Sequence, residues 1–501
     1  MRKIVVLLIF ALTPFCIVFG ENAVLHVKLV NGKAASSFLD VPGQPTSGSF
    51  TTVIKDSSTA LYTFKLTRPE FVNIYCFDSE NRAGKYFTYL FYLSPGDDLE
   101  LKADFNKPEF DFQVTGKGSN NNQPLMSAME SIDLHSLLKD TVPYRVIPVI
   151  NDAQKIREGN LEKYIKLYSP SASYVKDWKM SLHYYACNLY YDFKENNRLY
   201  TFDAYYRNLG KWGKIADSLF QVAKLDNDSA LGAFHYNVLL RSFLEREEEH
   251  FSDEDYLHPE TFYREWYHTD TVEGKKLFMS DRNNLPQEMI INRYFKGKTA
   301  EYLYAQLLFG AFYEVNHTNV LSIFARFKQK YPNSEYIAQF SSQVDAIIAK
   351  QKQTLNDRMV FVTDNGTKLN SLDEVLAMMK GKTVLVDMWG TWCGPCREEI
   401  EKNSAAIHEH FKDKGLTYLY IANKDMGNEE QWKKLIAYFN LEGMHIMANK
   451  NLTDDIMTKV KGNGFPTVFI IKKDGSYERS KTESPMNRDI LIKQLEGDLA
   501  E

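Results

Sequence analysis

The sequence predicts a multidomain chain with an N-terminal antiparallel, sandwich-like β domain, a central α-helical domain and a C-terminal domain of mixed α/β type. One observation is length: the chain has 501 residues, whereas about 150 residues per domain is usual. A second is the spacing of apolar residues, which changes from period two to helical spacing along the chain. A third is the alternation of strand and helix patterns after residue 359, which is typical of an α/β domain.

The composition narrows the classes of protein to consider. With 44% hydrophobic and 25% charged residues, the chain is neither collagen-like, nor a coiled coil, nor wholly disordered. The formal net charge is −5, and no stretch rich in lysine and arginine appears, so we expect no nucleic-acid partner. Five cysteines in 501 residues are too few for a disulfide scaffold.

Residues 1–20 have the pattern of an export signal. Arg2 and Lys3 precede an apolar run from Ile4 to Phe19, and small residues near Gly20 suit cleavage after that position. Lipid attachment at Cys16 is disfavoured because the preceding residue is bulky, and an uncleaved anchor is the other alternative. No later stretch is long and apolar enough to span a bilayer. We therefore predict an exported protein without a membrane span after cleavage, most simply in the periplasm of a Gram-negative bacterium.

The predicted β domain covers residues 21–118. Leu25, Val27 and Leu29 alternate with His26 and Lys28, which is the period of a half-buried strand. The same period recurs at 61–66 and 71–77, and turn residues separate the runs. A polar segment, 116–122, ends this region.

The predicted helical domain covers residues 119–352. Ala305, Leu308 and Phe312 have helical spacing, as do the apolar residues at 323, 324 and 327 in the next helix. Pro332 is expected to open the helix that follows. The many tyrosines of this region, such as Tyr184, are more simply explained by packing between helices than by a partner-binding surface.

The last predicted domain covers residues 359–501. We expect strands at 383–388, 416–422 and 467–472, and an edge strand at 477–479. Helices are expected directly after Cys393, at 429–439, at 454–460 and at 487–496.

The pair Cys393-Gly394-Pro395-Cys396 stands where a buried strand runs into a helix. A cysteine at a helix N-terminus has its thiolate stabilised by unpaired backbone N–H groups and the helix dipole, which lowers its pKa. Cys393 is therefore the predicted nucleophile. Cys396, one helical turn further on, can attack the mixed disulfide that Cys393 forms with a substrate. Pro395 suits the first helical turn, where no N–H partner is needed.

Zinc binding, haem attachment and a purely structural disulfide also use paired cysteines, but each fits this pair less well. A zinc site needs a further ligand pair, whereas His408 and His410 are separated by a single residue. Haem attachment needs a histidine after the second cysteine, where Arg397 stands. A structural disulfide across so short a loop would stabilise little. We therefore expect a redox-active disulfide between Cys393 and Cys396, no metal and no other cofactor.

A second motif, Gly464-Phe465-Pro466-Thr467, follows the Trp392–Cys396 motif by about 70 residues. Together these motifs make residues 359–501 resemble thioredoxin-like domains, and more closely the TlpA-like periplasmic thiol:disulfide oxidoreductases. The resemblance implies a thioredoxin fold, a cis peptide bond before Pro466, and pairing of the Phe465 backbone with a bound substrate strand.

The same resemblance extends the expected site and the expected fold. Trp392, Gly394 and Pro395 join the two residues of the second motif as the expected substrate-contacting set. Residues 364–372 resemble the hairpin that precedes the first helix of TlpA-like domains. Residues 444–460 resemble the central insertion of that class.

Three further residues have candidate roles. Asp387, in the apolar strand before the cysteines, would have its pKa raised by desolvation, which suits it to carry protons to and from Cys396. The alternative is a buried, hydrogen-bonded structural aspartate. Cys76 and Cys187 are most simply buried free thiols, although a bridge between them stays open.

The function expected from the sequence is an exported thiol:disulfide oxidoreductase, acting as a reductase on protein thiol or disulfide substrates. A reductase in an oxidising compartment needs electrons, and a membrane thiol protein is the expected donor. The alternative is an envelope binding or sensor protein in which the redox centre gates recognition by the first two domains. A peroxidase is a weaker possibility, since the proline-threonine-cysteine spacing of peroxiredoxins is absent.

Overall fold

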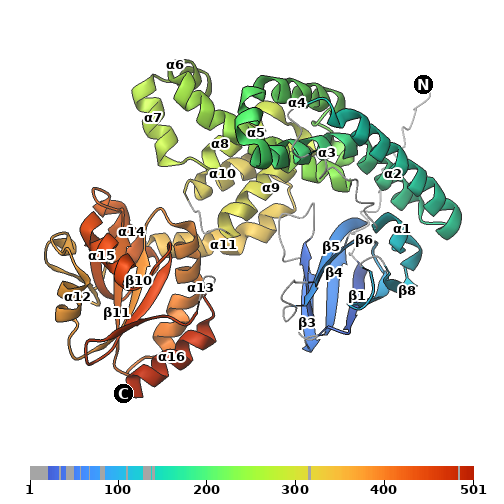
Figure 1. The fold of residues 1–501 in the computed structure, drawn as a ribbon. Helices are drawn as coiled ribbons and strands as arrows, with labels where there is room; N and C mark the ends of the chain where they lie inside the picture. Colours follow the sequence, from blue (N-terminus) through green and yellow to red (C-terminus); the bar gives the residue numbers. More distant parts are fainter. Residues whose placement is uncertain are drawn as a thin grey trace, which may run out of the picture. The chain divides into compact units, whose positions relative to one another are not determined.

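The computed structural model describes residues 21–500, apart from 33–34, 41–49, 57, 67, 79–84, 109–110, 128–136, 138–141, 314–317 and 483–485. The export signal predicted at residues 1–20, with Cys16, lies outside the described residues. The chain divides into two compact units, Met1–Gln306 and Leu307–Glu501 (Figure 1). Each unit is described by itself below.

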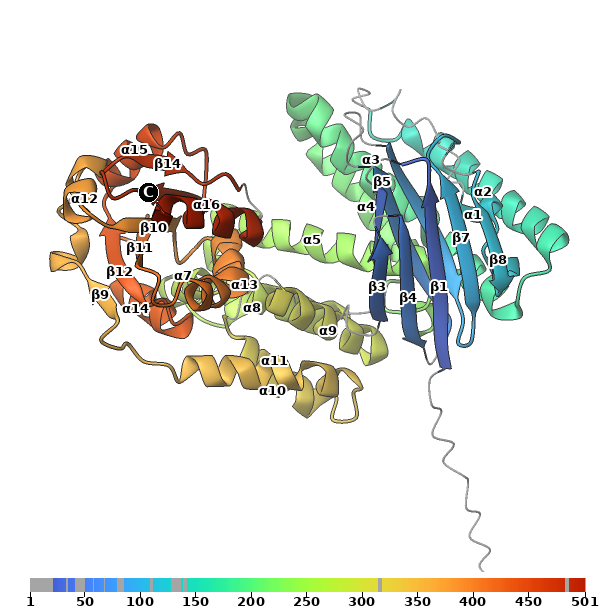
Figure 2. The same cartoon turned by 90° about the horizontal axis from the view of Figure 1, so that it is seen from below.

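The first unit begins with two β-sheets. Their strands are β1 (Glu21–Val30), β2 (Ala35–Asp40), β3 (Phe50–Asp56), β4 (Thr59–Leu66), β5 (Glu70–Asp78), β6 (Lys85–Leu93), β7 (Asp98–Asp104) and β8 (Gln113–Lys117). Five strands form one sheet in the order β3-β4-β1-β7-β8 (Figure 2), and the other sheet has the order β2-β5-β6.

One strand pair corrects the expectation of an antiparallel domain. β1 and β7 run parallel, with Val24 opposite Asp98, whereas the other pairs of both sheets are antiparallel. Alternation of apolar and polar residues identifies a half-buried strand but does not report the direction of its neighbour. Between β1 and β7 the chain passes through the other sheet, so the two strands meet without a hairpin.

The two sheets share one apolar core, as the sandwich prediction requires. Leu25 and Val27 of β1 are at most 1% exposed, and they belong to the same buried cluster as Ile74 of β5 and Tyr89 of β6. The opposite residues of β1, His26 and Lys28, are exposed. The period-two pattern therefore identified the buried face of this strand.

Helices complete the first unit. They are α1 (Pro124–Ser127), α2 (Val146–Tyr168), α3 (Ala172–Arg207), α4 (Leu209–Ala223), α5 (Phe234–Leu257), α6 (Pro259–Phe262), α7 (Thr271–Ser280) and α8 (Asn284–Tyr294), while α9 (Gly297–Tyr313) crosses into the second unit. Tyr184 and Tyr190 of α3 are at most 1% exposed. Packing between helices, the simpler reason for the tyrosine density, is thus confirmed for these residues.

An aromatic cluster joins the strands of the first unit to its helices. Phe71 of β5 and Tyr92 of β6 lie in one buried cluster with Tyr164, Tyr174 and Trp178. The rings of Phe71 and Trp178 meet edge to face at 5.3 Å. The predicted boundary at 118/119 stays a prediction, but the residues on its two sides share this core.

The second unit contains α10 (Val320–Lys330) and α11 (Tyr336–Gln351) before its sheet begins. The apolar spacing at 323, 324 and 327 correctly predicted α10, whose three residues there are buried. The prediction that Pro332 opens the next helix is wrong, because α11 begins at Tyr336. Pro332 lies in the turn instead, where its fixed φ is equally well accommodated.

A six-stranded sheet forms the centre of the second unit, in the order β14-β13-β10-β11-β12-β9. Its strands are β9 (Met359–Phe361), β10 (Thr383–Trp389), β11 (Leu416–Asn423), β12 (Gly443–Ala448), β13 (Thr467–Ile471) and β14 (Tyr477–Arg479). The central strand β10 runs parallel to β11 and antiparallel to β13. The four strands predicted from the sequence are confirmed as β10, β11, β13 and β14.

Helices cover both faces of this sheet (Figure 1). α12 (Leu372–Met378) and α15 (Lys450–Lys459) pack on one face, and α13 (Gly394–His410), α14 (Glu429–Tyr438) and α16 (Arg488–Ala500) pack on the other. The helix predicted at 454–460 begins four residues earlier, because Asn449 caps it by accepting a hydrogen bond from the Leu452 backbone N–H.

The hairpin expected at 364–372 is absent from this described segment. β9 instead pairs in parallel with β12 at the sheet edge, and a short 3-10 turn, Thr363–Gly366, follows it. Asp364 and Asn365 both have left-handed backbone angles, with φ of 53° and 55°. This turn leads the chain into α12 rather than back along β9.

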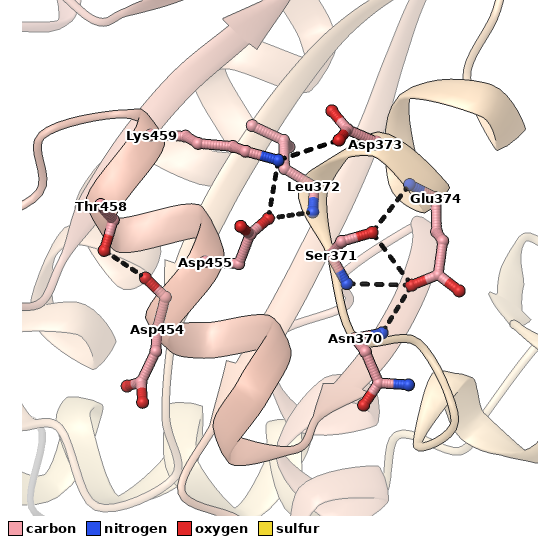
Figure 3. A network of polar contacts seen from close by, with 9 residues as sticks. All are labelled: Asn370, Ser371, Leu372, Asp373, Glu374, Asp454, Asp455, Thr458 and Lys459. Carbon is pink, nitrogen blue, oxygen red and sulfur yellow. Dashed lines mark hydrogen bonds and ion pairs between the residues drawn. The ribbon is translucent and has the colours of Figure 1, made fainter.

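Polar contacts tie α12 to α15 (Figure 3). Ser371 and Glu374 form a capping box at the start of α12. The carboxylate of Asp455 accepts a hydrogen bond from the Leu372 backbone N–H at 2.6 Å. Lys459 bridges Asp455 and Asp373 at 3.1 and 3.0 Å.

Within the described part of the chain, no helix is long and apolar enough to cross a membrane.

Candidate active site

The two cysteines of the motif form a disulfide at the start of α13, with an S–S distance of 2.04 Å. Cys393 is the N-cap residue, and its Sγ accepts a hydrogen bond from the Cys396 backbone N–H at 3.2 Å. Pro395 lies in the first turn. Both cysteines are buried: Cys393 is 3% exposed and Cys396 is 1% exposed. The two thiols therefore differ in their positions on the helix and not in their exposure. The sulfur at the N-cap lies nearest the positive end of the helix.

The loop before Cys393 is supported by Asn423, the last residue of β11. The indole N–H of Trp392 donates to the backbone oxygen of Asn423 at 2.8 Å, and the Asn423 side chain donates to the Trp389 backbone oxygen at 3.0 Å. Gly390 leaves room for this arrangement, since a Cβ there would lie 2.5 Å from the Trp392 indole nitrogen. The indole is held in place although Trp392 is 50% exposed.

A buried carboxylate completes the support of this loop. Asp425, 2% exposed, accepts hydrogen bonds from the backbone N–H and the side-chain hydroxyl of Thr391. Asn423 and Asp425 were not among the residues predicted from the sequence. A usable signal was present, because polar residues at the end of β11 and just beyond it must lie at the same sheet edge as the end of its parallel neighbour β10.

The second motif meets the first at this edge. The peptide bond between Phe465 and Pro466 is cis, as the resemblance implies. β13 begins directly afterwards, with Thr467 opposite Met388 of β10. The rings of Phe465 and Trp392 meet edge to face at 5.7 Å. The structure therefore brings together the expected substrate-contacting residues of both motifs, while their role stays a prediction.

Asp387 faces a cavity of about 30 Å³ between the sheet and α13. Its Oδ1 is buried and has no hydrogen-bond partner among the described residues. Burial, and after it the negative charge of Glu399, raises the pKa of Asp387 to about 7. The carboxyl group can therefore exchange protons near neutral pH. The alternative, that Asp387 is a structural aspartate held by hydrogen bonds, is less well supported because its Oδ1 has no such partner among the described residues.

Further polar groups, which were not predicted from the sequence, line the same cavity. The lining residues are Leu385, Asp387, Glu399, Ile400, Asn403, Ser404, Ile407, His408, Tyr418, Tyr420, Val468 and Met486. Glu399 lies three residues after Cys396 on α13, and helical spacing from the motif could have identified it. Tyr420 is opposite Asp387 in the pairing of β10 and β11.

His408 and Tyr420 are hydrogen-bonded, with 2.8 Å between the imidazole Nε2 and the phenol oxygen. The imidazole also stacks on Tyr418 at a ring distance of 3.7 Å. Burial lowers the pKa of His408 to about 4, so the ring is neutral at neutral pH. The cavity is thus lined by a neutral imidazole, two phenols and two carboxyl groups.

The other described cysteines are single thiols. Cys76 lies in the sandwich core and Cys187 on α3, and both are buried and free. Burial raises the pKa of each thiol to about 12. The structure therefore favours free thiols over the bridge that the sequence left open. Among the described residues, no group of three or more His, Cys, Asp or Glu side chains is arranged to hold a metal ion.

Comparison with known proteins defines the class of this domain. A family model described as thioredoxin-like matches residues 381–477. Residues 381–477 therefore form a thioredoxin-like domain.

Curated relatives are similar over the same part of the chain. Thiol-disulfide oxidoreductase ResA of Bacillus cereus is 29% identical over 119 residues, which are 23% of this chain and 60% of the relative. ResA of Bacillus subtilis is 27% identical over 119 residues, 23% of this chain and 59% of the relative. The chain thus spans about 60% of the length of these relatives.

A solved structure is similar to this domain as well. The thioredoxin domain of a thiol-disulfide oxidoreductase from Bacteroides vulgatus is 28% identical in sequence to the matched part of this chain. The match covers 24% of this chain and 82% of the solved chain, with a TM-score of 0.21.

Proposed function

We propose that this protein is an exported thiol:disulfide oxidoreductase that reduces disulfides of protein substrates. The observation that carries the proposal is the placement of Cys393 as the N-cap of α13, with Cys396 in the first turn as its disulfide partner. The helix N-terminus stabilises a thiolate at Cys393.

The reaction begins from the dithiol form. The Cys393 thiolate attacks one sulfur of a substrate disulfide, which forms a mixed disulfide and releases the other substrate sulfur as a thiolate that takes a proton from solvent. Cys396 then loses its proton and attacks the Cys393 sulfur. The mixed disulfide breaks, the Cys393–Cys396 bond forms, and the substrate leaves with both sulfurs reduced. Two electrons have moved from the protein dithiol to the substrate.

Asp387 accepts the Cys396 proton in this scheme. Its cavity reaches the turn of α13 that follows Cys396, where Glu399 and Ile400 line the wall, and Ile400 packs in the same cluster as both cysteines. A volume of about 30 Å³ is enough for a water molecule to relay the proton. A carboxyl group with a pKa of about 7 can both accept and return the proton near neutral pH.

The substrate backbone docks along the edge formed by the two motifs. Phe465 and Pro466 present the backbone next to the disulfide, and Trp392 is exposed beside them. Gly394 and Pro395 complete the surface, because a glycine and a proline leave the cysteine pair without bulky polar neighbours. The substrate class is therefore an extended protein segment that contains a disulfide.

Reduction is the proposed direction of electron flow. The Gly-Pro pair between the cysteines resembles that of reducing thioredoxins, with potentials near −270 mV, more than that of strong oxidants near −120 mV. A membrane thiol protein is the proposed donor that restores the dithiol. Export rests on the pattern of residues 1–20, and the periplasm is the proposed compartment.

The test is a trapping experiment in cells that export the protein. Cys396→Ala leaves Cys393 able to attack but removes the resolving thiol, so mixed disulfides with substrate proteins should accumulate and should disappear on reduction. Cys393→Ala with Cys396→Ala is the matched control and should trap nothing. An empty trap, together with no insulin reduction by the purified protein, would support the alternative of a binding or sensor protein.

A further inference from the structure

Residues 423–428, which connect β11 to α14, place a lysine beside the cysteine loop. This residue, Lys424, has left-handed backbone angles, with φ of 58°. Such angles are unfavourable for a residue with a Cβ atom, and they persist where the surroundings fix them, often at functional sites. Asn423 and Asp425 are 0% and 2% exposed, and their side chains hydrogen-bond backbone groups of the chain just before Cys393. The backbone of Lys424 is therefore fixed from both sides.

The charge of Lys424 lies next to the expected substrate-contacting residues. Its side chain is exposed, and the ammonium group is 5.5 Å from the centre of the Trp392 ring, where the π system of an indole attracts a cation. The Trp392 ring also meets Phe465, at 5.7 Å. The ammonium group thus lies one aromatic ring away from the residue whose backbone is proposed to pair with a substrate.

Positive charge predominates at the sheet edge that carries the disulfide, which we call the redox edge. Three segments form it at the ends of β10 and β11 and before β13: 390–397, 423–428 and 461–466. They contain three cationic residues: Arg397, Lys424 and Lys461. The chain as a whole has a net charge of −5, so the redox edge is a basic region of an acidic protein.

Negative charge near the redox edge is already partnered. Asp425 is the single acidic residue of the three segments, and it is buried under two hydrogen bonds from Thr391. The next acidic residues along the first two segments, Glu398 and Glu429, form ion pairs with lysines one helical turn further on. In contrast, no ion pair of Lys424 is found within the described residues.

We propose that Lys424 is a specificity-determining residue whose ammonium group pairs with an acidic side chain next to the substrate disulfide. The inference rests on the proposed function, because it names the class of disulfide that the cysteine pair reduces. That class is an extended protein segment with aspartate or glutamate beside the cysteine that Cys393 attacks. Complementary charge speeds the encounter with such a segment, and like charge disfavours a segment rich in lysine or arginine.

A purely supporting role is the alternative, in which the cation only holds the indole. Trp392 is already held by its hydrogen bond to Asn423 and by its contact with Phe465, and an exposed cation adds little to these contacts. Loss of support would slow the reduction of every substrate alike. Loss of charge recognition would change the order of preference among substrates, so the two roles have different readouts.

The test uses three cyclic peptides of one sequence, each closed by a disulfide that is flanked by glutamate, glutamine or lysine. The full chain is reduced, freed of dithiothreitol and mixed with each peptide, and the second-order rate constant of peptide reduction is measured. The preference is the ratio of this constant for the glutamate peptide to that for the lysine peptide. Comparing the preference between variants cancels the reactivity of the peptides and any general change at Cys393.

Lys424→Glu should lower the preference by about fivefold or more, because it replaces attraction by repulsion. Lys424→Gln, which only removes the charge, should give an intermediate preference. Lys382→Glu is the matched control, since it makes the same charge change at an exposed lysine just before β10, at the opposite end of that strand from the cysteine loop. The control should keep the preference of the unaltered protein, and added salt should reduce that preference.

Three results would overturn the inference while the proposed function stands. One is the same preference in both Lys424 variants as in the unaltered protein. Another is an equal slowing of all three peptides by these variants, which would leave Lys424 with the supporting role. The third is an equal loss of preference in Lys382→Glu, which would assign the effect to the charge of the whole protein. Failure of the unaltered protein to reduce any of the peptides would instead overturn the proposed function, and this inference with it.

Discussion

Replacing Asp387 with asparagine should change how stability depends on pH. The asparagine has nearly the same shape and cannot ionise, whereas burial raises the pKa of Asp387 from 3.8 to about 7. An acid whose folded-state pKa is raised binds more protons when folded than when unfolded, so its contribution to stability falls as pH rises between those two values. Above about pH 7 this decrease in stability is complete.

The magnitude follows from the shift of the pKa. A shift of about 3 units at about 1.4 kcal/mol per unit gives an upper limit of about 4 kcal/mol for the cost of the buried charge. Between about pH 5 and pH 8 the cost should increase by about 2 to 3 kcal/mol. Asp387→Asn should therefore gain this amount relative to the unaltered protein over the same interval.

The assay is urea unfolding of both oxidised proteins at the two pH values, followed by pulsed hydrogen exchange of peptides from β10. Because β10 belongs to the second unit, hydrogen exchange in its peptides reports the unfolding of that unit. The asparagine variant keeps every other side chain of the cavity, so the comparison isolates Asp387 to a first approximation. A difference in unfolding free energy that does not change with pH would refute the buried, neutral carboxyl group and with it the proposed proton carrier.

Three further results are expected. Gly390→Ala should slow insulin reduction severalfold, because the new Cβ would displace the Trp392 indole, and normal turnover would contradict this. Gly497→Ala, with open space at its Cβ and no left-handed φ, is the control and should reduce insulin at the normal rate. Ser371→Ala should destabilise the second unit by about 1 kcal/mol, since it breaks a capping box, as measured by urea unfolding. Cys76 and Cys187 should resist alkylation in the folded protein at about pH 8, because burial raises the pKa of both thiols to about 12. If the two thiols were modified as fast in the folded protein as in urea, they would be accessible and the prediction would be wrong.

Local patterns predicted the elements that carry the redox pair. The apolar run of β10, the cysteine at the N-cap and Pro395 in the first turn are neighbours in sequence, and their geometry follows from strand and helix rules. The cis bond before Pro466 came from the resemblance. Asp387 was found because a single carboxylate in an apolar strand is unusual.

Contacts between distant segments were not predictable in the same way. Asp425 reaches Thr391 from the end of another strand, and Tyr420 faces Asp387 only because β10 and β11 pair in one particular register. The parallel pairing of β1 with β7 likewise depends on the path of the chain between the sheets. Periodicity identifies buried faces but does not say which faces meet.

The central claim is that Cys393 attacks substrate disulfides and Cys396 resolves the product. Insulin reduction by the purified protein, with dithiothreitol as the electron source, tests it most directly when Cys393→Ser and Cys396→Ser are compared with the unaltered chain. Catalysis is expected from the unaltered chain and none from Cys393→Ser. Cys396→Ser, reduced first, freed of dithiothreitol and then mixed with insulin, should form a mixed disulfide on Cys393 that is seen in the intact mass. Absence of catalysis by the unaltered chain, or a mixed disulfide formed on Cys396 in Cys393→Ser but none on Cys393, would contradict it.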